Sequence, residues 1–363
     1  MTLPKRSWVE ISLGAIASNY RAICDLTGPR VTVAAVVKAD AYRHGAVEIA
    51  RVLEREGAAW LAVSNAEEGV ELREAGVQAR ILVMADGPHV ADLNLTPVIH
   101  SLDALAEVKP RTAYHLKLDT GMGRLGTREP AAVLVEAIRK CPGVLEGLMT
   151  HFASSADYIG LQTEEQMADF AATAAALRAA GSEPQYLHAC STIPIAYGRR
   201  GAWHNMVRPG MALYGYVSPA RGDAPPCELR LTPALTWRAS VLEVKDVPKG
   251  AHIGYGAGFI TPRPMRIGIL ALGYADGLPH RLSGRGRMIA AGAWAPILGA
   301  VSMDLTTIDL SAAPQVKRGD GVTILGGDGE LVQDAQMLAR EAGTISYSLL
   351  CGIHERVRRV YVA

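Results

Sequence analysis

The alternation of short apolar runs with helical patterns over the first 210 residues constrains the fold more than any other feature of this sequence. The runs cover residues 31–37, 59–63, 80–84, 96–99, 113–118, 144–150, 186–188 and 205–207. Short runs of this kind are typical of strands buried on both faces of a parallel sheet. Eight strands, each followed by a helix, predict a (β/α)8 barrel of the TIM type.

Helix boundaries are also predicted from local signals. Segments 65–68 and 163–166 resemble capping boxes, and Ser12 is placed to cap a helix that ends at Gly28. Gly76 and Gly181 fall where a glycine would follow the last helical turn.

The pattern changes near residues 218–226, which are rich in proline and glycine. Strand-like runs separated by glycine turns follow, at 235–244, 266–272, 287–291, 294–298, 305–308, 322–325 and 356–362, with one helix near 334–342. These runs predict a C-terminal, mostly antiparallel β domain. We expect a barrel over residues 1–225 and a β domain over 226–363, with residues 1–10 able to pair with the β domain.

Composition excludes several classes of partner. The chain has 37 basic and 36 acidic residues and no long run of one sign, so neither nucleic acid nor an anionic membrane is expected as a partner. No apolar run is long enough to cross a bilayer, and the charged first ten residues lack the apolar region of a secretory signal. The five cysteines are odd in number and widely spaced, which indicates reduced thiols in a cytoplasmic protein. No histidine pair has a metal-binding spacing, so no metal is expected.

Polar side chains follow the predicted strands where a barrel of this kind carries its chemistry. They lie at Lys38, at 119–124, at His151, at 188–192 and at 208–210. Ser191 and Thr192, with the amides around Gly210 and Met211, are suited to hold a phosphate. An amine facing a phosphate site suggests pyridoxal phosphate bound as an imine on Lys38. Taken singly, Ser191 and Thr192 could be ordinary helix caps and His151 a buried core histidine.

Longer motifs resemble those of the alanine racemases, a family of the pyridoxal phosphate fold type III group. They occur in family order at 36–42, 116–126, 150–153, 207–215, 254–256, 272–277, 301–304 and 345–347. The resemblance implies an isomerase that interconverts L-alanine and D-alanine on pyridoxal 5′-phosphate. It also implies a cytoplasmic homodimer, with D-alanine biosynthesis as the expected role and alanine catabolism as the alternative that the sequence leaves open.

The resemblance implies two opposed bases. Lys38 would bind the cofactor and move the proton on the D side, and Tyr255 from the partner subunit would act on the L side. Two bases are needed because a single base would return the proton to the face it came from. Lysine and tyrosine both have ordinary pKa values of roughly 10, so neighbouring charges must lower them.

The remaining roles also follow from the resemblance. Arg208 would face the pyridine nitrogen with support from His151, and the phosphate would be held by Tyr42, Ser191, Thr192, Tyr347 and the amides of Gly210 and Met211. Arg124 would contact the substrate carboxylate, with Met303 and Tyr274 contributed by the partner chain. Lys117 can be carbamylated in family members and then positions Arg124.

Three positions depart from the family pattern. Arg43 stands where glycine is usual, and 188–193 reads His-Ala-Cys-Ser-Thr-Ile in place of His-x-x-Asn-Ser-Ala. His280 stands where arginine often follows the proline. Three rivals stay open at this point: a racemase for another small amino acid such as serine, a decarboxylase of similar layout, and a non-catalytic pyridoxal phosphate carrier.

Overall fold

The computed structural model describes residues 6–363 and divides into two compact units. One unit comprises residues 15–41 and 45–232, and the other comprises the chain up to residue 14 with residues 42–44 and 233–363. The boundary predicted after residue 225 stays a prediction. Residues 1–5 of the segment expected to pair with the β domain lie outside the described residues.

The first unit is a nearly closed barrel of eight parallel strands, in the order β8-β7-β6-β5-β4-β3-β2-β9. The strands are β2 (Thr32–Val36), β3 (Trp60–Val63), β4 (Arg80–Val83), β5 (Thr96–Ile99), β6 (Ala113–Lys117), β7 (Val144–Met149), β8 (Tyr186–His188) and β9 (Met206–Val207). The predicted barrel is confirmed, because each predicted run contains one of these strands.

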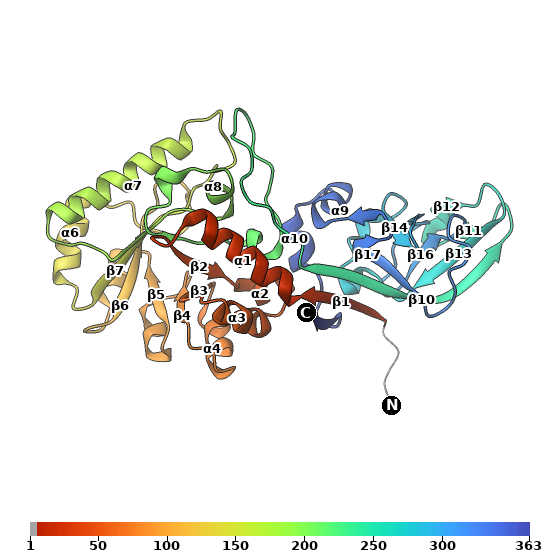
Figure 1. The fold of residues 1–363 in the computed structure, drawn as a ribbon, viewed down its shortest axis with the longest axis horizontal. Coiled ribbons are helices and arrows are strands. Elements are labelled where there is room, and N and C mark those ends of the chain that lie inside the picture. The colour runs from red at the N-terminus through yellow and green to blue at the C-terminus, as the bar shows by residue number, and fades with distance from the viewer. Residues whose placement is uncertain (1–5) are drawn as a thin grey trace. The chain divides into compact units, whose positions relative to one another are not determined.

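Helices surround the barrel strands (Figure 1). They are α1 (Leu13–Thr27), α3 (Ala46–Arg55), α4 (Ala66–Glu74), α5 (Leu102–Ala106), α6 (Ala131–Lys140), α7 (Gln162–Ala179) and α8 (Thr192–Ala196). Alternation along β6 divides its side chains between two environments. Tyr114 and Leu116 belong to the apolar core that contains Leu134 of α6 and Phe170 of α7. His115 and Lys117 therefore point into the barrel.

β8 and β9 are the first and last strands of the barrel order, and among the described residues no strand pairing joins them. Single hydrogen bonds close this seam between β8 and β9 instead. The Asn205 side chain takes the place of a paired strand: its Oδ1 accepts from the Leu187 amide (2.7 Å) and its Nδ2 donates to the Gln185 carbonyl (2.6 Å). At the other end of the seam the Arg208 amide donates to the Cys190 carbonyl (2.8 Å). The Asn205 side chain and the Arg208 backbone amide thus join β8 to β9 and complete the barrel wall.

The helix-cap predictions are partly right. Asn65 caps α4 by accepting from the Glu68 amide (3.1 Å), and Gly76 and Gly181 follow helix ends with φ of 84° and 83°. The Glu68 carboxylate, however, accepts from the Ser64 amide, so only half of the predicted capping box forms. The cap predicted at Thr163 is wrong, because α7 begins at Gln162 and Thr163 is buried within its first turn.

The second unit is the predicted β domain, and it is mostly antiparallel. Its main sheet runs β15-β14-β17-β10-β1-β19, with β13, β16 and β18 joined to it. The elements are β1 (Ser7–Ser12), β10 (Leu235–Val247), β13 (Met265–Leu270), β14 (Arg287–Ala290), β15 (Ala293–Pro296), β16 (Thr306–Asp309), β17 (Gly321–Asp328), β18 (Leu331–Gln333), β19 (Arg358–Val362) and helix α9 (Ala335–Glu341). β1 lies antiparallel to β10 and parallel to β19. The two-residue strands β11 (His252–Ile253) and β12 (Phe259–Ile260), and helix α10 (Ser346–Cys351), were not predicted.

The segment that joins the first barrel strand to helix α3 is a left-handed helical turn, α2 (Lys38–Arg43). Ala39, Asp40, Ala41, Tyr42 and Arg43 all have φ between 52° and 65°. Each such residue costs about 1–2 kcal/mol relative to a right-handed conformation. Two carboxylates hold the turn: Glu68 accepts from the Ala39 amide (2.7 Å), and Asp40 accepts from the Ala46 amide (2.7 Å).

Replacing Arg43 by glycine is expected to stabilise the protein. Arg43 has φ of 65° and its ion pair with Glu355 (3.2 Å) is exposed on the Glu355 side, so the pair contributes little. Glycine removes the steric cost of a positive φ, and the net gain after its larger unfolded-state entropy is about 0.5 kcal/mol. Thermal unfolding should show Arg43→Gly melting about 1 °C higher.

Arg51→Gly in the right-handed helix α3 is the matched control. Arg51 is likewise an ion-paired arginine, joined to Glu48 at 2.7 Å. Glycine there should lower the free energy of unfolding by about 1 kcal/mol. An equal loss in the free energy of unfolding in Arg43→Gly and Arg51→Gly would contradict the account of backbone strain at Arg43.

Candidate active site at the barrel rim

Four cations gather at the carboxyl ends of the barrel strands. Lys38 follows β2, Lys117 ends β6, Arg124 lies in the next loop, and Arg208 follows β9. Burial lowers the pKa of Lys117 to about 8, with further lowering by the charges of Arg124, Arg208 and Lys38. A concentration of positive charge of this kind favours anionic groups such as phosphate and carboxylate.

Replacing Lys117 by methionine is expected to stabilise the protein most at neutral pH. The folded-state pKa of about 8 lies below the ordinary 10.5, so the penalty for the buried cation is fully present below pH 8. That penalty disappears as the pH rises from 8 toward 10.5, because the amine is then neutral in the folded state. Urea unfolding in buffer free of carbon dioxide, where Lys117 is a free amine, should show a gain of about 2 kcal/mol at pH 7 that shrinks by pH 10.

Lys140→Met is the control, because Lys140 is an exposed residue at the end of α6. It should change stability little at either pH. A gain for Lys117→Met that is the same at pH 7 and pH 10 would contradict a depressed lysine pKa as its cause.

Arg208 lies at the centre of the site and is 3% exposed. Its Nη1 donates to His188 Nδ1 (2.8 Å) and to the His188 carbonyl (2.9 Å). Its Nη2 donates to the Thr150 carbonyl (2.7 Å) and the Ala189 carbonyl (3.3 Å). Burial lowers the pKa of Arg208 to about 10, so the guanidinium keeps its proton at neutral pH. It can therefore donate a hydrogen bond without transferring a proton.

His151 follows β7 and lies beside Arg208, whose Nη2 is 3.4 Å from His151 Nδ1. Burial and then the charge of Arg208 lower the pKa of His151 to about 3. The ring is therefore neutral, with Nδ1 as acceptor.

Gln166, predicted as part of a helix cap, fixes the loop that carries His151. Its Nε2 donates to the His151 carbonyl (3.1 Å) and its Oε1 accepts from the Ala153 amide (2.9 Å). Gln166 is 1% exposed, so these bonds are shielded from water. Sequence reasoning assigned it no part in the site.

A cradle of donors lies between β8 and β9. Thr192 Oγ1 accepts from the amides of Gly210 (3.1 Å) and Ala212 (3.2 Å), which leaves its hydroxyl hydrogen to donate elsewhere. The Ser191 side chain makes no capping hydrogen bond to α8. Ser191 is thus not the ordinary helix cap that was its simpler interpretation. Next to a recessed arginine and a lysine, this donor set fits the phosphate, ring and aldehyde of pyridoxal 5′-phosphate.

Arg124 is presented by a loop built around Asp119. Asp119 Oδ1 accepts from the amides of Gly121 (3.2 Å) and Gly123 (2.9 Å), and its Oδ2 accepts from Arg128 (2.8 Å). The two glycines have φ of 135° and 68°, which suit glycine and explain the Gly-x-Gly spacing. The arginine that follows is exposed at the rim.

In the second unit, Tyr42 and Tyr347 lie close together. Their ring centroids are 6.2 Å apart, in a tilted arrangement. Tyr42 belongs to the left-handed turn and is 8% exposed, and Tyr347 belongs to α10.

The predicted residues Tyr255, Tyr274 and Met303 lie on three adjoining loops of the second unit. The Tyr274 amide donates to the Ser302 carbonyl (3.0 Å), and the Ala275 amide donates to the Met303 carbonyl (3.0 Å). Gly254, before Tyr255, packs against the backbone at Ala300. Tyr255, Tyr274 and Met303 are 78%, 45% and 54% exposed, respectively. Three large, partly apolar side chains on one surface are typical of a binding surface.

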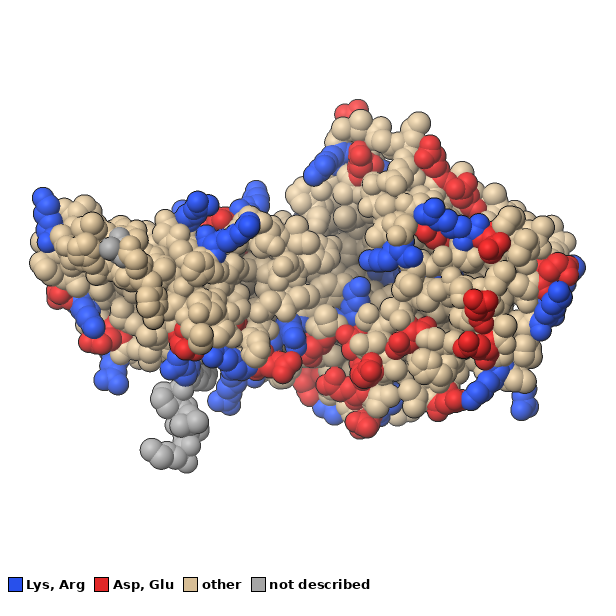
Figure 2. Space-filling view, turned by 180° about the vertical axis from the view of Figure 1, so that it is seen from behind, with Lys and Arg blue, Asp and Glu red and all other residues tan. Residues whose placement is uncertain are grey.

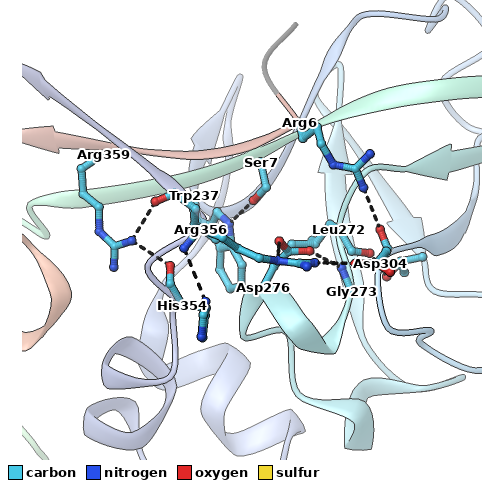
Figure 3. A network of polar contacts seen from close by, with 12 residues as sticks. Arg6, Ser7, Trp237, Leu272, Gly273, Asp276, Asp304, His354, Arg356 and Arg359 are labelled. Atoms are coloured by element: carbon cyan, nitrogen blue, oxygen red, sulfur yellow. Dashed lines mark hydrogen bonds and ion pairs between the residues drawn. The ribbon is translucent and has the colours of Figure 1, made fainter. Parts of the chain in front are cut away.

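Arg356 ties two of these loops together (Figure 3). Its Nε donates to Asp276 (2.7 Å) and its Nη2 donates to Asp304 (2.7 Å). The other oxygen of Asp276 accepts from the Gly273 amide (2.8 Å), directly before Tyr274. Arg356 is the residue that sequence reasoning missed here, because its partners lie 80 and 52 positions away.

Other kinds of site are not found among residues 6–363. They contain no cluster of three histidine, cysteine or acidic side chains placed to hold a metal ion. No helix of this part of the chain is long and apolar enough to cross a membrane. Basic and acidic side chains are interspersed on the face shown in Figure 2.

Known proteins resemble the chain over its whole length. Family models described as alanine racemase, N-terminal domain and C-terminal domain match residues 11–219 and 234–361. Alanine racemases of Synechocystis sp. and Carboxydothermus hydrogenoformans are 36% and 38% identical to it, the matches covering 99% and 98% of this chain and 99% of each relative. The structure of alanine racemase from Streptomyces lavendulae superposes with a TM-score of 0.90 at 33% identity, covering 100% of this chain and 98% of that one.

A further solved relative bears on the cofactor. Alanine racemase from Bartonella henselae, described with covalently bound pyridoxal phosphate, has a TM-score of 0.86 at 26% identity and covers 99% of this chain and 100% of that one. Two family models that together span nearly all the residues, relatives above 30% identity and this agreement of fold lead to one conclusion. The chain belongs to the alanine racemase family.

Proposed function

We propose that this protein interconverts L-alanine and D-alanine with pyridoxal 5′-phosphate as cofactor. The observation that carries the proposal is the buried Arg208, which is held by carbonyls and imidazoles and sits among Lys38, Lys117 and the donor cradle. Full-length similarity to alanine racemases supports the same reaction.

The cofactor supplies a conjugated ring that withdraws electrons from the substrate Cα, and Arg208 limits how strongly it does so. An arginine at the ring nitrogen donates a hydrogen bond but keeps its proton. Arg208 would therefore leave the ring nitrogen largely unprotonated, which would disfavour decarboxylation and transamination. We propose that the Ser191 and Thr192 hydroxyls and the Met211 amide hold the phosphate, while the Gly210 amide, which donates to Thr192 Oγ1, orients that hydroxyl toward it. The Tyr42 and Tyr347 hydroxyls would add to this set.

Lys38 and Tyr255 are proposed as the two bases, acting on opposite faces of the substrate Cα. Lys38 Nζ would hold the cofactor covalently and move the D-side proton. Tyr255 would move the L-side proton in the site of a partner subunit, which requires a homodimer. The exposure of Tyr255, Tyr274 and Met303 on one surface supports this arrangement.

Arg124 is proposed to bind the substrate carboxylate from the barrel rim. Only a neutral lysine amine reacts with carbon dioxide, so the lowered pKa of Lys117 favours its carbamylation. A carbamate would turn a cation beside Arg124 into an anion that orients the guanidinium. Carbon-13 NMR in labelled bicarbonate should show one carbamate signal that Lys117→Met removes.

The protein is proposed to act in the cytoplasm as a source of D-alanine. No disulfide joins its five cysteines, all of which lie among the described residues, and this suits a reducing compartment.

Chiral chromatography of separate L-alanine, L-serine and L-lysine incubations tests the reaction and its substrate. D-alanine should form fastest. If no D-isomer forms from any of them while borohydride still reduces an imine on the protein, the racemase proposal fails. D-serine forming faster than D-alanine would reassign the substrate.

A further inference from the structure

Buried polar groups form a chain through the barrel interior, away from the substrate. The chain begins at Arg208, whose Nη1 donates to His188 Nδ1 at 2.8 Å. His188 Nε2 lies 2.8 Å from His115 Nδ1. His115 Nε2 faces Glu146 Oε2 at 3.6 Å, and Arg80 holds the Glu146 carboxylate through both of its oxygens, at 2.5 and 2.7 Å.

The order of protons along this chain follows from Arg208 alone. A guanidinium only donates, so His188 Nδ1 must accept and its proton must lie on Nε2. That proton faces His115 Nδ1, which must also accept, so His115 carries its proton on Nε2. The Nε2–H then points to Glu146. Arg208 and His188 therefore donate in the same direction, and the Nε2–H of His115 faces the Glu146 carboxylate across 3.6 Å.

Burial keeps both imidazoles neutral, as this order requires. His115 and His188 are fully buried, and burial lowers the pKa of each below its usual range. Burial alone would raise the pKa of Glu146, but its contacts with His115 and Arg80 lower that pKa to about 2. Glu146 is thus the anionic end of the chain at any physiological pH.

The surroundings of His115 are shaped for its ring. A Cβ on Gly147 would lie 2.4 Å from His115 Nδ1, so only glycine leaves room for the ring at this place. Trp60 packs against the ring with centroids 5.3 Å apart, and Arg80 lies 4.0 Å above the Trp60 ring. Within the described residues, His115 Nε2 has no hydrogen-bond partner nearer than the Glu146 carboxylate.

The hydrogen bonds of Arg208 explain why an anion is needed at the far end. In the described part of the chain they go to carbonyl oxygens and imidazole nitrogens and to no carboxylate. A buried cation without a counter-charge is costly. Two polarised imidazoles bring the negative charge of Glu146 to bear on Arg208, because hydrogen bonds in series strengthen one another.

We propose that Glu146, held by Arg80, is a positioning residue for racemisation, because its negative charge stabilises the order of protons that Arg208 sets in His188 and His115 and so holds the donor geometry of Arg208 at the cofactor ring nitrogen. This inference rests on the proposed function. The proposal gives the Arg80–Glu146 ion pair a part in the reaction although it lies far from Lys38. Arg80 begins β4 and Glu146 lies in the first half of β7, whereas Lys38 follows the carboxyl end of β2.

Nitrogen-15 NMR of histidine-labelled full-length protein, with and without pyridoxal phosphate, tests the proton order directly. Signals of His115 and His188 are assigned by single His→Gln variants. Both rings should be neutral with the proton on Nε2 from pH 6 to 9. A proton on Nδ1 of either ring would overturn the proposal whether or not the protein racemises alanine.

Glu146→Gln then tests the role of the carboxylate. Arg80 attracts the amide oxygen, so the amide NH2 turns to His115 and places donor against donor. His115 should show a second state with its proton on Nδ1, and the absorption band of the bound cofactor should shift. Transamination events per racemisation should rise about fivefold, as expected when a charge-assisted hydrogen bond becomes a neutral one.

Glu228→Gln is the matched control, because Arg200 holds Glu228 in the same two-oxygen pair, at 2.8 and 2.7 Å, on the surface. Glu228→Gln should leave the histidine signals, the absorption band of the bound cofactor and the ratio of transamination to racemisation as in the unaltered protein. Gly147→Ala displaces the His115 ring without changing a charge, and should reproduce the NMR effect if the Glu146→Gln protein does not fold. Unchanged histidine signals and an unchanged transamination ratio in Glu146→Gln would reduce the Arg80–Glu146 pair to a structural ion pair.

Discussion

Replacement of Tyr255 by phenylalanine is expected to lower racemisation by about a thousandfold while leaving the cofactor bound. The hydroxyl is the proposed proton carrier on the L side, and removal of a general acid–base group typically costs 10²–10⁴-fold. The fold should survive, because Tyr255 is 78% exposed and lies in a short loop. Chiral chromatography measures the loss, and borohydride reduction measures the bound cofactor.

Solvent deuterium separates the two proposed bases. In heavy water, Tyr255→Phe should still exchange the α-proton of D-alanine, because Lys38 serves that face, but should exchange that of L-alanine far more slowly. Tyr361→Phe in β19, a strand without a predicted site residue, is the control and should racemise normally. Full racemisation by Tyr255→Phe would show that the two-base assignment is wrong.

Replacement of Arg208 by lysine is expected to lower racemisation by about a hundredfold and to raise the share of transamination. A single ammonium cannot reproduce the hydrogen bonds by which the guanidinium joins His188, Thr150 and Ala189. Each buried carbonyl left without a donor costs about 1–3 kcal/mol, so the melting temperature should fall as well. A lysine can also transfer its proton to the ring nitrogen, which strengthens the electron withdrawal that Arg208 limits.

Arg199→Lys separates the chemical effect from the loss of stability. Arg199 also has a largely buried side chain, pairs with Glu164 and lies 3.9 Å above the Tyr158 ring. Its replacement should lower the melting temperature without changing the ratio of transamination to racemisation. The same ratio in both variants would contradict the role of Arg208 at the ring nitrogen.

The barrel strands could be predicted because burial on both faces leaves a continuous apolar signal in each. The left-handed turn after β2 could not, since its five residues are ordinary L-amino acids whose intrinsic preference is right-handed. The turn forms because distant groups hold it: Glu68, 29 positions away, binds its first amide. For β1 the sequence indicated only that residues 1–10 could pair with the β domain, and neither its bounds nor its partners, because β10 and β19 lie more than 200 positions along the chain.

The candidate site shows the same limit. Lys38, Arg124, His151 and Arg208 could be placed together because parallel strands bring their carboxyl ends to one rim. Gln166, Arg356 and the chain from His188 to Glu146 were missed, because a lone glutamine, arginine or histidine carries no local pattern. Their importance lies in partners supplied by tertiary contacts alone.

The Asn205 side chain that completes the barrel wall also makes the protein vulnerable to chemical ageing. Asn205 is exposed, and hydrolysis of its amide would replace the Nδ2 donor with an oxygen facing the Gln185 carbonyl, now 2.6 Å away. The bond from the Leu187 amide would persist while its neighbour became a repulsion. A single deamidation would thus weaken the wall between β8 and β9 at the amino end of β8, whereas the bond between the Arg208 amide and the Cys190 carbonyl, beside Ser191 and Thr192, would remain, so an aged preparation would lose stability before it lost the phosphate site.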